Sequence, residues 1–385
     1  AEDAVLDFEI TANRPDCLSV LGMAREAATR YRLPLKAVAP PPLRGREDEL
    51  VGLLVTIEDA QACPRYTAAI ADVTIGPSPA WLARRLEAAG VRPINNVVDV
   101  TNYVLLETGH PLHAFDLARL GGRELRIRRA LPGERITTLD GQNRALTPEM
   151  LVIADATRAQ AVGGVMGGAD SEVRSGTTTI AIESAYFQPA SIRRTSKRLG
   201  LSTEASYRFE RGADIEAPLR ALARTCQLLE QIGAGRVREN WIDLYPGQRP
   251  ATVVDLSVSA AGRFLGRDVP AADVDRILTA LGFGLDPLDD DRRRVTVPTW
   301  RGDVARDVDL YEEIARHDGY DRLPLTFPAL AHATPAPDRR LEIERTAKRL
   351  AARAGFSESV TFTFIGRAAA AAFAVEDDLV AIANP

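Results

Sequence analysis

A short stretch of the chain places a hydroxyl, an amide and an imidazole close together. Thr101 and Asn102 lie in a run with the apolar spacing of a short helix over residues 97–104, and His113 follows a Gly and a Pro that end this helix. Near one helix end, these three groups could converge on a bound carbonyl. The alternative is that Thr101 and Asn102 satisfy local backbone groups and that His113 is an ordinary half-buried histidine.

A second candidate is the glycine-rich run Gly163-Gly-Val-Met-Gly-Gly. Because it has four glycines in six residues, few Cβ atoms obstruct its backbone, and the N–H groups can approach a phosphate or a carbonyl closely. A tight turn between two strands is the alternative. The run lacks the glycine order of a dinucleotide loop and the Lys of a P-loop, so the sequence predicts no nucleotide site here.

Glu183 is a third candidate, because it follows the apolar residues 180–182 and a carboxylate is costly to bury without a partner. At the mouth of a pocket, its carboxylate could accept a hydrogen bond from a hydroxyl group. The alternative, which the residue types alone favour, is a solvated strand end.

An acidic set lies towards the C-terminal part of the chain. Asp309, Glu312 and Glu313 stand at positions i, i+3 and i+4, so one helix face presents three carboxylates, and Asp303 comes from the preceding loop. Such crowding is costly without a counter-cation, and hard oxygen ligands of this kind suit Mg²⁺. By spacing alone, a solvated acidic helix start that is stabilised by the helix dipole is the commoner arrangement.

The elements that position these residues alternate irregularly between helix and strand. Asp16 is the expected N-cap of the first helix. Helices are predicted over residues 18–30, 78–90, 189–200 and 216–231, and strands over 51–57, 66–75, 125–129, 134–139, 151–154 and 178–183. This pattern predicts a sheet-rich α+β domain with interleaved helices rather than a regular βαβ alternation.

A predicted linker over residues 244–250 separates this domain from a smaller one. The smaller domain is expected to contain strands over 252–258 and 294–297, helices near residue 264 and over 271–281, and a helix after Arg306. Residues 324–337 form a second predicted linker. It is followed by a helix over 339–354 with an apolar inner face and by a strand over 360–365.

Composition sets limits on the class of protein. The 385 residues are 45% apolar and 26% charged, which is ordinary for a soluble globular protein of two or three domains. The net charge of −5 argues against a globally basic nucleic-acid binder. The basic helix over residues 189–200, with Arg193-Arg194 and Lys197-Arg198, could still meet a phosphate backbone, although a solvated helix face is an equal alternative.

Cysteine usage and the chain ends add further expectations. Three widely spaced cysteines suggest neither a disulfide framework nor a zinc site, and they fit a reducing, cytoplasmic compartment. No apolar run is long enough to cross a bilayer. Residues 1–10 alternate like a strand, and because the chain lacks an initiator Met and ends just after an apolar stretch, we expect it to be a fragment.

Five motifs, taken in order, carry a family resemblance that spans almost the entire chain. They are residues 13–26, 95–116, 163–168, 203–212 and 300–304. Together they resemble the beta subunit of bacterial phenylalanyl-tRNA synthetases. The chain has His110 where Gln is expected in this family's motif.

The resemblance implies a domain order. Residues 1–245 would form a B3/B4-like editing domain and residues 250–325 a helix-rich B5-like domain, whose DNA-binding-like fold we expect to have a structural role. Residues 338–385 would begin a catalytic-like domain with the class II synthetase shape but without its chemistry. The family's N-terminal OB-type domain and C-terminal anticodon-binding domain would be absent.

The resemblance also implies an editing site that hydrolyses tyrosine wrongly esterified to tRNA(Phe). The attacking group would be a positioned water, helped by the terminal ribose hydroxyl, rather than a Ser-type nucleophile. The implied residues are Thr101, Asn102 and His113 around the amino acid and the ester, Glu183 as acceptor of the phenolic hydroxyl, Gly167 in the glycine loop, and Thr203 and Ala205 in the pocket wall.

The implied partners are those of a two-subunit enzyme. A Mg²⁺ at the alpha-subunit interface would be bound through the acidic set, and aminoacylation with ATP, phenylalanine and tRNA(Phe) would take place in the alpha subunit of an alpha2-beta2 assembly. Two alternatives stay open. One is a stand-alone deacylase that shares the central domain, and the other is a non-catalytic scaffold with a decayed editing pocket.

Overall fold

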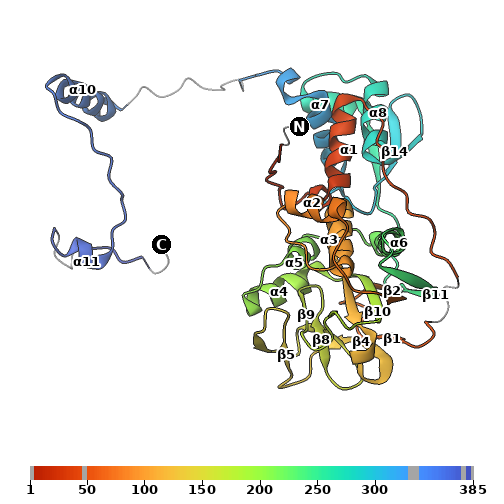
Figure 1. The fold of residues 1–385 in the computed structure, drawn as a ribbon. Coiled ribbons are helices and arrows are strands. Elements are labelled where there is room, and N and C mark those ends of the chain that lie inside the picture. The colour runs from red at the N-terminus through yellow and green to blue at the C-terminus, as the bar shows by residue number, and fades with distance from the viewer. Residues whose placement is uncertain (1–3, 46–49, 328–337, 374–378, 383–385) are drawn as a thin grey trace. The chain divides into compact units, whose positions relative to one another are not determined.

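The chain forms two compact units in a computed structural model that describes residues 4–45, 50–327, 338–373 and 379–382. The first unit is Ala1–Pro324 and the second is Leu325–Pro385 (Figure 1). The fold class is α+β with several domains, as the sequence predicts. In the described part of the chain, no helix is both long and apolar enough to cross a membrane.

Two sheets face each other in the first unit. The antiparallel four-stranded sheet has the order β11 (Gly235–Leu244), β2 (Arg65–Val73), β10 (Thr179–Tyr186) and β3 (Leu112–Asp116). The five-stranded sheet has the order β1 (Leu54–Ile57), β4 (Glu124–Arg129), β7 (Leu151–Ala154), β8 (Ala159–Val162) and β9 (Met166–Gly167). A hairpin of β5 (Arg135–Thr137) and β6 (Asn143–Ala145) lies beside β8.

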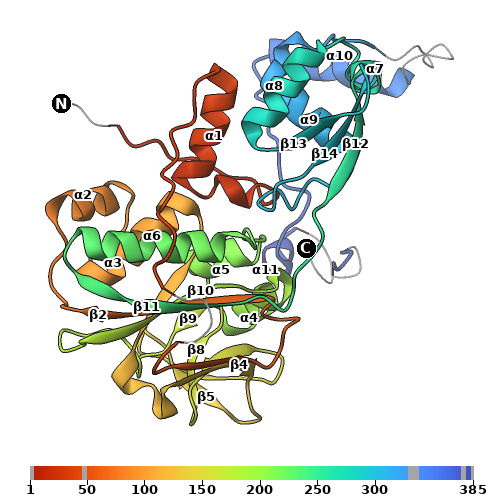
Figure 2. The same cartoon turned by 90° about the vertical axis from the view of Figure 1, so that its right-hand side faces the viewer.

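Three helices cover the outer face of the four-stranded sheet, so this sheet is the middle layer of three (Figure 2). The helices are α2 (Ala80–Ala88), α3 (Asn96–Thr108) and α6 (Ala217–Gln231). The sheet has two apolar faces because its side chains alternate. On β10, Ile180 and Ile182 pack against the helices, whereas Ala181 and Ala185 face the second sheet.

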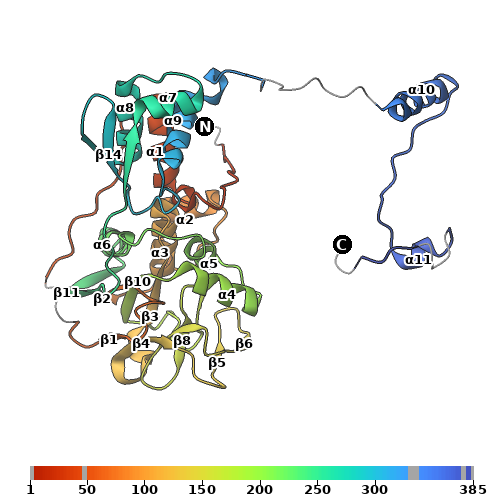
Figure 3. The ribbon, with the colours of Figure 1, turned by 180° about the vertical axis from the view of Figure 1, so that it is seen from behind.

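Two short helices close one side of the core between the sheets. They are α4 (Pro189–Leu199) and α5 (Glu204–Phe209), which pack against each other and contribute Ile192 and Phe209 to that core (Figure 3). Three 3₁₀ turns, η1 (Pro15–Cys17), η2 (Leu117–Arg119) and η3 (Gly121–Arg123), complete the connections of this part of the unit.

The rest of the first unit is a smaller α+β region with its own apolar core. Its sheet has the order β12 (Val253–Ser257), β14 (Arg292–Thr296) and β13 (Gly284–Pro287), and its helical elements are α7 (Val258–Leu265), α8 (Ala271–Leu281), α9 (Asp307–Asp318) and η4 (Tyr320–Arg322). Helix α1 (Val20–Tyr31) packs on α3 as well as on α8 and α9. The N-terminal helix therefore joins the two regions into one unit.

The second unit contains α10 (Arg339–Arg353) and α11 (Arg367–Ala370). The predicted helix over 339–354 is confirmed, but its inner-face side chains Ile343 and Leu350 are exposed. The strand predicted over 360–365 is not formed, because no second strand of the described residues pairs with it. Part of the predicted linker, residues 328–337, lies outside the described residues.

Two local predictions are corrected near the N-terminus. Residues 4–10 form no strand, and residues 1–3 lie outside the described residues. Ser19, rather than Asp16, is the N-cap of α1, because its hydroxyl accepts a hydrogen bond from the N–H of Gly22 at 3.0 Å. The proposed domain limits 1–245, 250–325 and 338–385 remain predictions.

Candidate active site between the two sheets

His113 and Glu183 lie side by side in the four-stranded sheet. They are directly opposite each other in the antiparallel pairing of β3 with β10. Their neighbours two positions along, Phe115 and Ala181, belong to the core between the sheets. Because strand side chains alternate with a period of two, His113 and Glu183 also face the second sheet.

Glu183 is buried in the middle of β10 and is not a solvated strand end. Glu183 is 6% exposed, and its Oε2 accepts a hydrogen bond from the hydroxyl of fully buried Tyr66 at 2.8 Å. Burial raises the pKa of Glu183 to about 8, against the opposing effect of the Tyr66 hydrogen bond. Among the described residues, Oε1 accepts no hydrogen bond, so this carboxyl oxygen can accept a hydrogen bond from a ligand hydroxyl.

The imidazole of His113 is held by aromatic packing rather than by hydrogen bonds. Its ring stands edge-on to Phe115 with 4.5 Å between ring centroids, and its buried Nε2 has no hydrogen-bond partner among the described residues. Burial lowers the pKa of His113 to about 4, so the ring is neutral near pH 7. A neutral imidazole with an unpartnered nitrogen can accept or donate one hydrogen bond to a bound group.

The glycine-rich run is the tight turn that joins β8 to β9, and it brings Gly167 onto His113. In this turn Gly164 has a φ of +68°, which favours glycine. A Cβ atom added to Gly167 would lie 2.5 Å from Cε1 of His113. The turn therefore packs closely against the imidazole of His113. The alternative of a phosphate-binding loop is not supported.

Thr203 and Ala205 complete this region from α5. The Thr203 hydroxyl caps the helix by accepting from the N–H of Ser206 at 3.0 Å, and it donates to the carbonyl oxygen of Val165 in the glycine turn at 2.8 Å. Ala205 packs against the core between the sheets. Five of the predicted residues, His113, Gly167, Glu183, Thr203 and Ala205, are thus grouped around one end of this core.

Thr101 and Asn102 approach from the other side of the sheet, and their convergence with His113 on one bound carbonyl remains a prediction. Both residues lie on α3, whose valines pack on Ile180 and Ile182, on the opposite face of the sheet from His113. The Thr101 hydroxyl donates to the carbonyl oxygen of Val98 at 2.7 Å. For Thr101, the local backbone role is therefore the one observed.

His110 is a fully buried neighbour of the site, since its ring stands edge-on to Phe209 at a centroid distance of 5.9 Å. Burial lowers its pKa to about 3. It therefore behaves as a neutral core side chain.

The acidic set is engaged by arginines rather than arranged around an empty centre. Both oxygens of Asp303 accept from the Arg301 guanidinium at 2.8 Å. Buried Glu313 accepts from Arg301 at 2.6 Å and from Arg316 at 2.9 Å. Burial raises the pKa of Glu313, but the hydrogen bonds from these two arginines outweigh it and lower the pKa to about 2.

The other two acidic residues point elsewhere. Asp309 caps the start of α9, where its Oδ2 accepts from the N–H groups of Ala305 at 3.0 Å and Arg306 at 2.8 Å. Glu312 is exposed, next to buried Glu313. The four carboxylates therefore do not fit a shared Mg²⁺ as they lie in this chain, and the predicted metal set is not supported.

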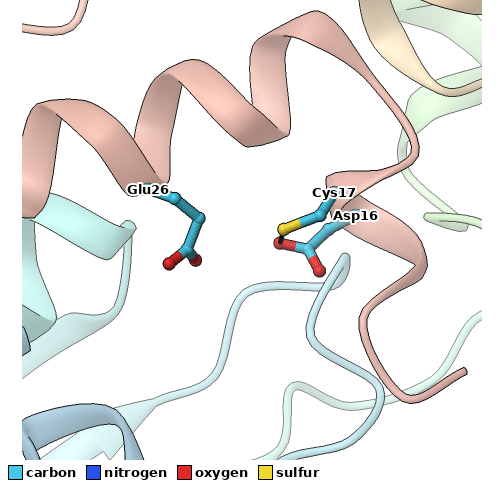
Figure 4. A group of neighbouring side chains, drawn as sticks. All are labelled: Asp16, Cys17 and Glu26. Carbon is cyan, nitrogen blue, oxygen red and sulfur yellow. Dashed lines mark hydrogen bonds between the residues drawn. The ribbon is translucent and has the colours of Figure 1, made fainter. Parts of the chain in front are cut away.

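A different group, Asp16, Cys17 and Glu26, brings possible metal-ligating atoms within 4.8 Å of one another (Figure 4). The Arg14 guanidinium lies among them, donating to Asp16 at 2.8 Å, to the Cys17 sulfur at 3.3 Å and also to Glu26. Burial and the Asp16 carboxylate raise the pKa of Cys17 to about 12. A protonated thiol beside a fixed cation does not fit a metal site.

Comparison with known proteins gives three matching family models along the chain. The B3/4 domain matches residues 62–234, the tRNA synthetase B5 domain 254–320, and the phenylalanyl tRNA synthetase beta chain CLM domain 323–385. The phenylalanine–tRNA ligase beta subunit of Geobacter metallireducens is 46% identical over 94% of the chain, and that of Moorella thermoacetica 47% over 95%.

The chain belongs to the phenylalanyl-tRNA synthetase beta subunit family. It spans about half the length of the curated relatives it matches, covering 46% and 45% of the two just named. An N-terminal fragment of the phenylalanyl-tRNA synthetase beta subunit from Pyrococcus horikoshii is a more distant match, with 12% identity and a TM-score of 0.42 over 80% of this chain and 85% of that one. That likeness is too low to bear on the site. The candidate active site lies within the part that matches the B3/4 domain, which is the family's editing domain.

Tyr66 is the member of the site that sequence reasoning missed. The sequence predicts only a strand at Tyr66, although it indicates that Glu183 needs a partner if it is buried. The alternation of β2, in which Tyr66, Ala68 and Ile70 share a face, is a signal that places the Tyr66 ring between the sheets.

Proposed function

We propose that the site between the two sheets hydrolyses the ester of tyrosine wrongly attached to tRNA(Phe). The observation that carries this proposal is the buried Glu183 carboxyl, which has one oxygen fixed by Tyr66 and the other without a partner among the described residues. Such a group can form a hydrogen bond with the phenolic hydroxyl of tyrosine, whereas a phenylalanine side chain forms none. This discrimination complements a synthetic site, because an apolar pocket rejects an added hydroxyl by only about 10²-fold.

The proposed hydrolysis uses a water molecule as nucleophile. Neutral His113 accepts a hydrogen bond from this water through a ring nitrogen and orients the water towards the ester carbonyl carbon. Water adds to that carbon, the bond to the ribose oxygen breaks, and the water proton passes to the departing oxygen, directly or through the adjacent ribose hydroxyl. The products are free tyrosine and uncharged tRNA.

In the whole protein, we propose that the chain acts within a beta subunit of phenylalanine–tRNA ligase. An alpha subunit would attach phenylalanine to tRNA(Phe) with ATP, in an alpha2-beta2 assembly in the cytoplasm. The names of the relatives and the match of residues 323–385 to the beta chain CLM domain support this proposal. We assign no step to Mg²⁺, because arginines and backbone donors engage Asp303, Asp309 and Glu313.

The test compares release of tyrosine from tyrosyl-tRNA(Phe) with release of phenylalanine from phenylalanyl-tRNA(Phe). Wild-type chain should favour tyrosine, Glu183→Ala should lose that preference, and His113→Ala should slow both reactions. Glu87→Ala, an exposed glutamate on α2 in the opposite layer, is the matched control and should behave as wild type. If the wild-type chain releases neither amino acid while it remains folded, the proposal fails in favour of a non-catalytic scaffold.

A further inference from the structure

One face of α4 carries four cations and is exposed along its whole length. Ser191, Ile192, Thr195 and Ser196 are its buried residues. Because a helix repeats every 3.6 residues, the remaining positions form one outward face. We call this face, formed by exposed Arg193, Arg194, Lys197 and Arg198, the α4 basic face.

A groove of about 600 Å³ continues the α4 basic face at the start of the helix. It lies between the first turn of α4 and the loop over residues 246–249, and Arg194 belongs to both the face and the groove. The polar and charged side chains that line the groove are Gln61, Arg129, Gln188, Ser191, Arg194, Gln248 and Arg249, and no carboxylate is among them. The groove can therefore hold negative charge without repulsion.

Most of these cations have no counter-charge. Among the described residues, Arg193, Arg194, Lys197 and Arg249 form no ion pair. Two are paired: Arg129 in the groove pairs with Asp59 at 2.7 Å, and Arg198 lies 3.3 Å from an exposed Glu149 oxygen. An exposed pair of that kind contributes little. In a chain with a net charge of −5, a surface where six cations gather and only two of them have a carboxylate partner favours a polyanionic ligand.

The α4 basic face is directly connected to the candidate active site. Gly200 caps the end of α4, and three residues later Thr203 caps the start of α5 and donates to the carbonyl oxygen of Val165 in the glycine turn. The 11-residue helix is about 16 Å long. Phosphates bound along α4 would therefore lie within a few nucleotides of an ester at His113 and Glu183.

We propose that the α4 basic face and its groove bind the phosphate backbone of the RNA strand whose 3′ end carries the aminoacyl ester. This inference rests on the proposed function, since the RNA is the substrate's own strand. The cations contact phosphates, which fixes the position of the strand without reading its bases. The surface thus delivers the ester to the site, and the site itself selects tyrosine.

Salt dependence of binding gives the first test, with a fluorescein-labelled tRNA(Phe) acceptor-stem hairpin as the probe. If four cations contact single-stranded phosphates, the binding constant should fall about 50-fold between about 50 and 200 mM salt, and about 7-fold when two are removed. The variant is Arg194→Gln with Lys197→Gln. The control is Arg84→Gln with Arg92→Gln, which removes the same charge from exposed residues in and after α2, on the opposite layer.

An equal salt dependence for wild type, variant and control would overturn the proposal. Because this measurement needs no hydrolysis, it is independent of the editing reaction. Thermal unfolding of both double variants checks their fold, and since all four side chains are exposed, we expect unchanged midpoints.

Hydrolysis of two substrates gives the second test. The α4 variant should raise KM for tyrosyl-tRNA(Phe) by the same factor by which its binding constant for the hairpin falls at the same salt concentration, with little change in kcat. It should hydrolyse tyrosyl-adenosine, which has no phosphate, at the wild-type rate. Equal losses on both substrates would show that the substitutions damage the site, and this outcome would overturn the proposal. If wild type hydrolyses neither substrate, the proposed function fails, while the binding test still decides whether the surface holds RNA.

Discussion

The buried carboxyl of Glu183 should make stability depend on pH in an unusual direction. Its pKa rises from 4.5 to about 8 in the folded chain because burial disfavours the charged form. Between these values, the folded state holds a proton that the unfolded state has released. The contribution of Glu183 to stability is therefore complete below about pH 4.5 and is lost as the pH rises to about 8.

The size of this effect follows from the shift. Each pKa unit is worth about 1.4 kcal/mol, so the whole window corresponds to about 5 kcal/mol. The matched variant is Glu183→Gln, which does not titrate and keeps an oxygen that can accept from the Tyr66 hydroxyl. Other titrating groups are common to both proteins and cancel in the difference between them.

The assay is denaturant unfolding of wild type and Glu183→Gln at half-unit steps from pH 5 to 8.5. The free energy of unfolding of wild type minus that of the variant should fall by about 1.4 kcal/mol per pH unit between about pH 5 and 7, and it should level off above about pH 8. Isotope-edited infrared spectra of the Glu183 carboxyl should show its protonated form at pH 6. A difference that stays constant with pH, together with an ionised carboxylate at pH 6, would refute the reasoning.

Three further predictions concern neighbouring groups. Gly167→Ala should abolish most tyrosyl-tRNA deacylation, because its Cβ would lie 2.5 Å from the imidazole, whereas Gly176→Ala, with open space around the new methyl group, should deacylate normally. Tyr66→Phe should cost about 1 kcal/mol of stability, measured by denaturant unfolding, and should raise the pKa of Glu183 further, seen as a higher midpoint in the infrared titration. Added Mg²⁺ should leave the thermal midpoint of the chain unchanged, since arginines occupy the acidic set, and a clear rise at millimolar Mg²⁺ would contradict this.

The elements were largely predictable because they rest on local patterns. The helix over 271–281 and the basic helix after Pro189 have the predicted spacing and end at glycines in the left-handed region. The strand over 360–365 was not formed, because a strand needs a partner and β-branched or aromatic composition cannot supply one. Local patterns thus fix helices better than isolated strands.

Grouping of the site residues was harder to predict, because nearness along the chain differs from nearness in space. Thr101 lies closer in sequence to His113 than Glu183 does, yet the sheet separates Thr101 from it and strand pairing places Glu183 opposite. The decisive quantity is the face to which each residue points, and that depends on the register between β3 and β10. Glu183 joined the site in the sequence analysis through family resemblance rather than through spacing.

The acidic set failed for a related reason. Spacing on one helix was correct for Asp309 and Glu313, but a helix face does not show which cations approach it from other segments. Arg301 comes from the loop before α9 and donates hydrogen bonds to both Asp303 and Glu313. A crowd of carboxylates requires positive charge, and the sequence leaves open whether arginine or a metal provides it.

The contrast between these two carboxyl groups is the strongest argument for the position of the site. Buried Glu313 has two arginines that keep it ionised, as expected of a carboxylate that serves structure. Glu183 has a single hydrogen-bond partner, the Tyr66 hydroxyl, and lies beside His113. Nε2 of His113 has no partner among the described residues, and Gly167 packs against the ring with no room for a methyl group. Three departures from ordinary packing at one place are expected where function outweighs stability. Glu183→Leu should therefore raise the free energy of unfolding at pH 8, where the carboxyl contributes least, and should at the same time abolish selectivity for tyrosine.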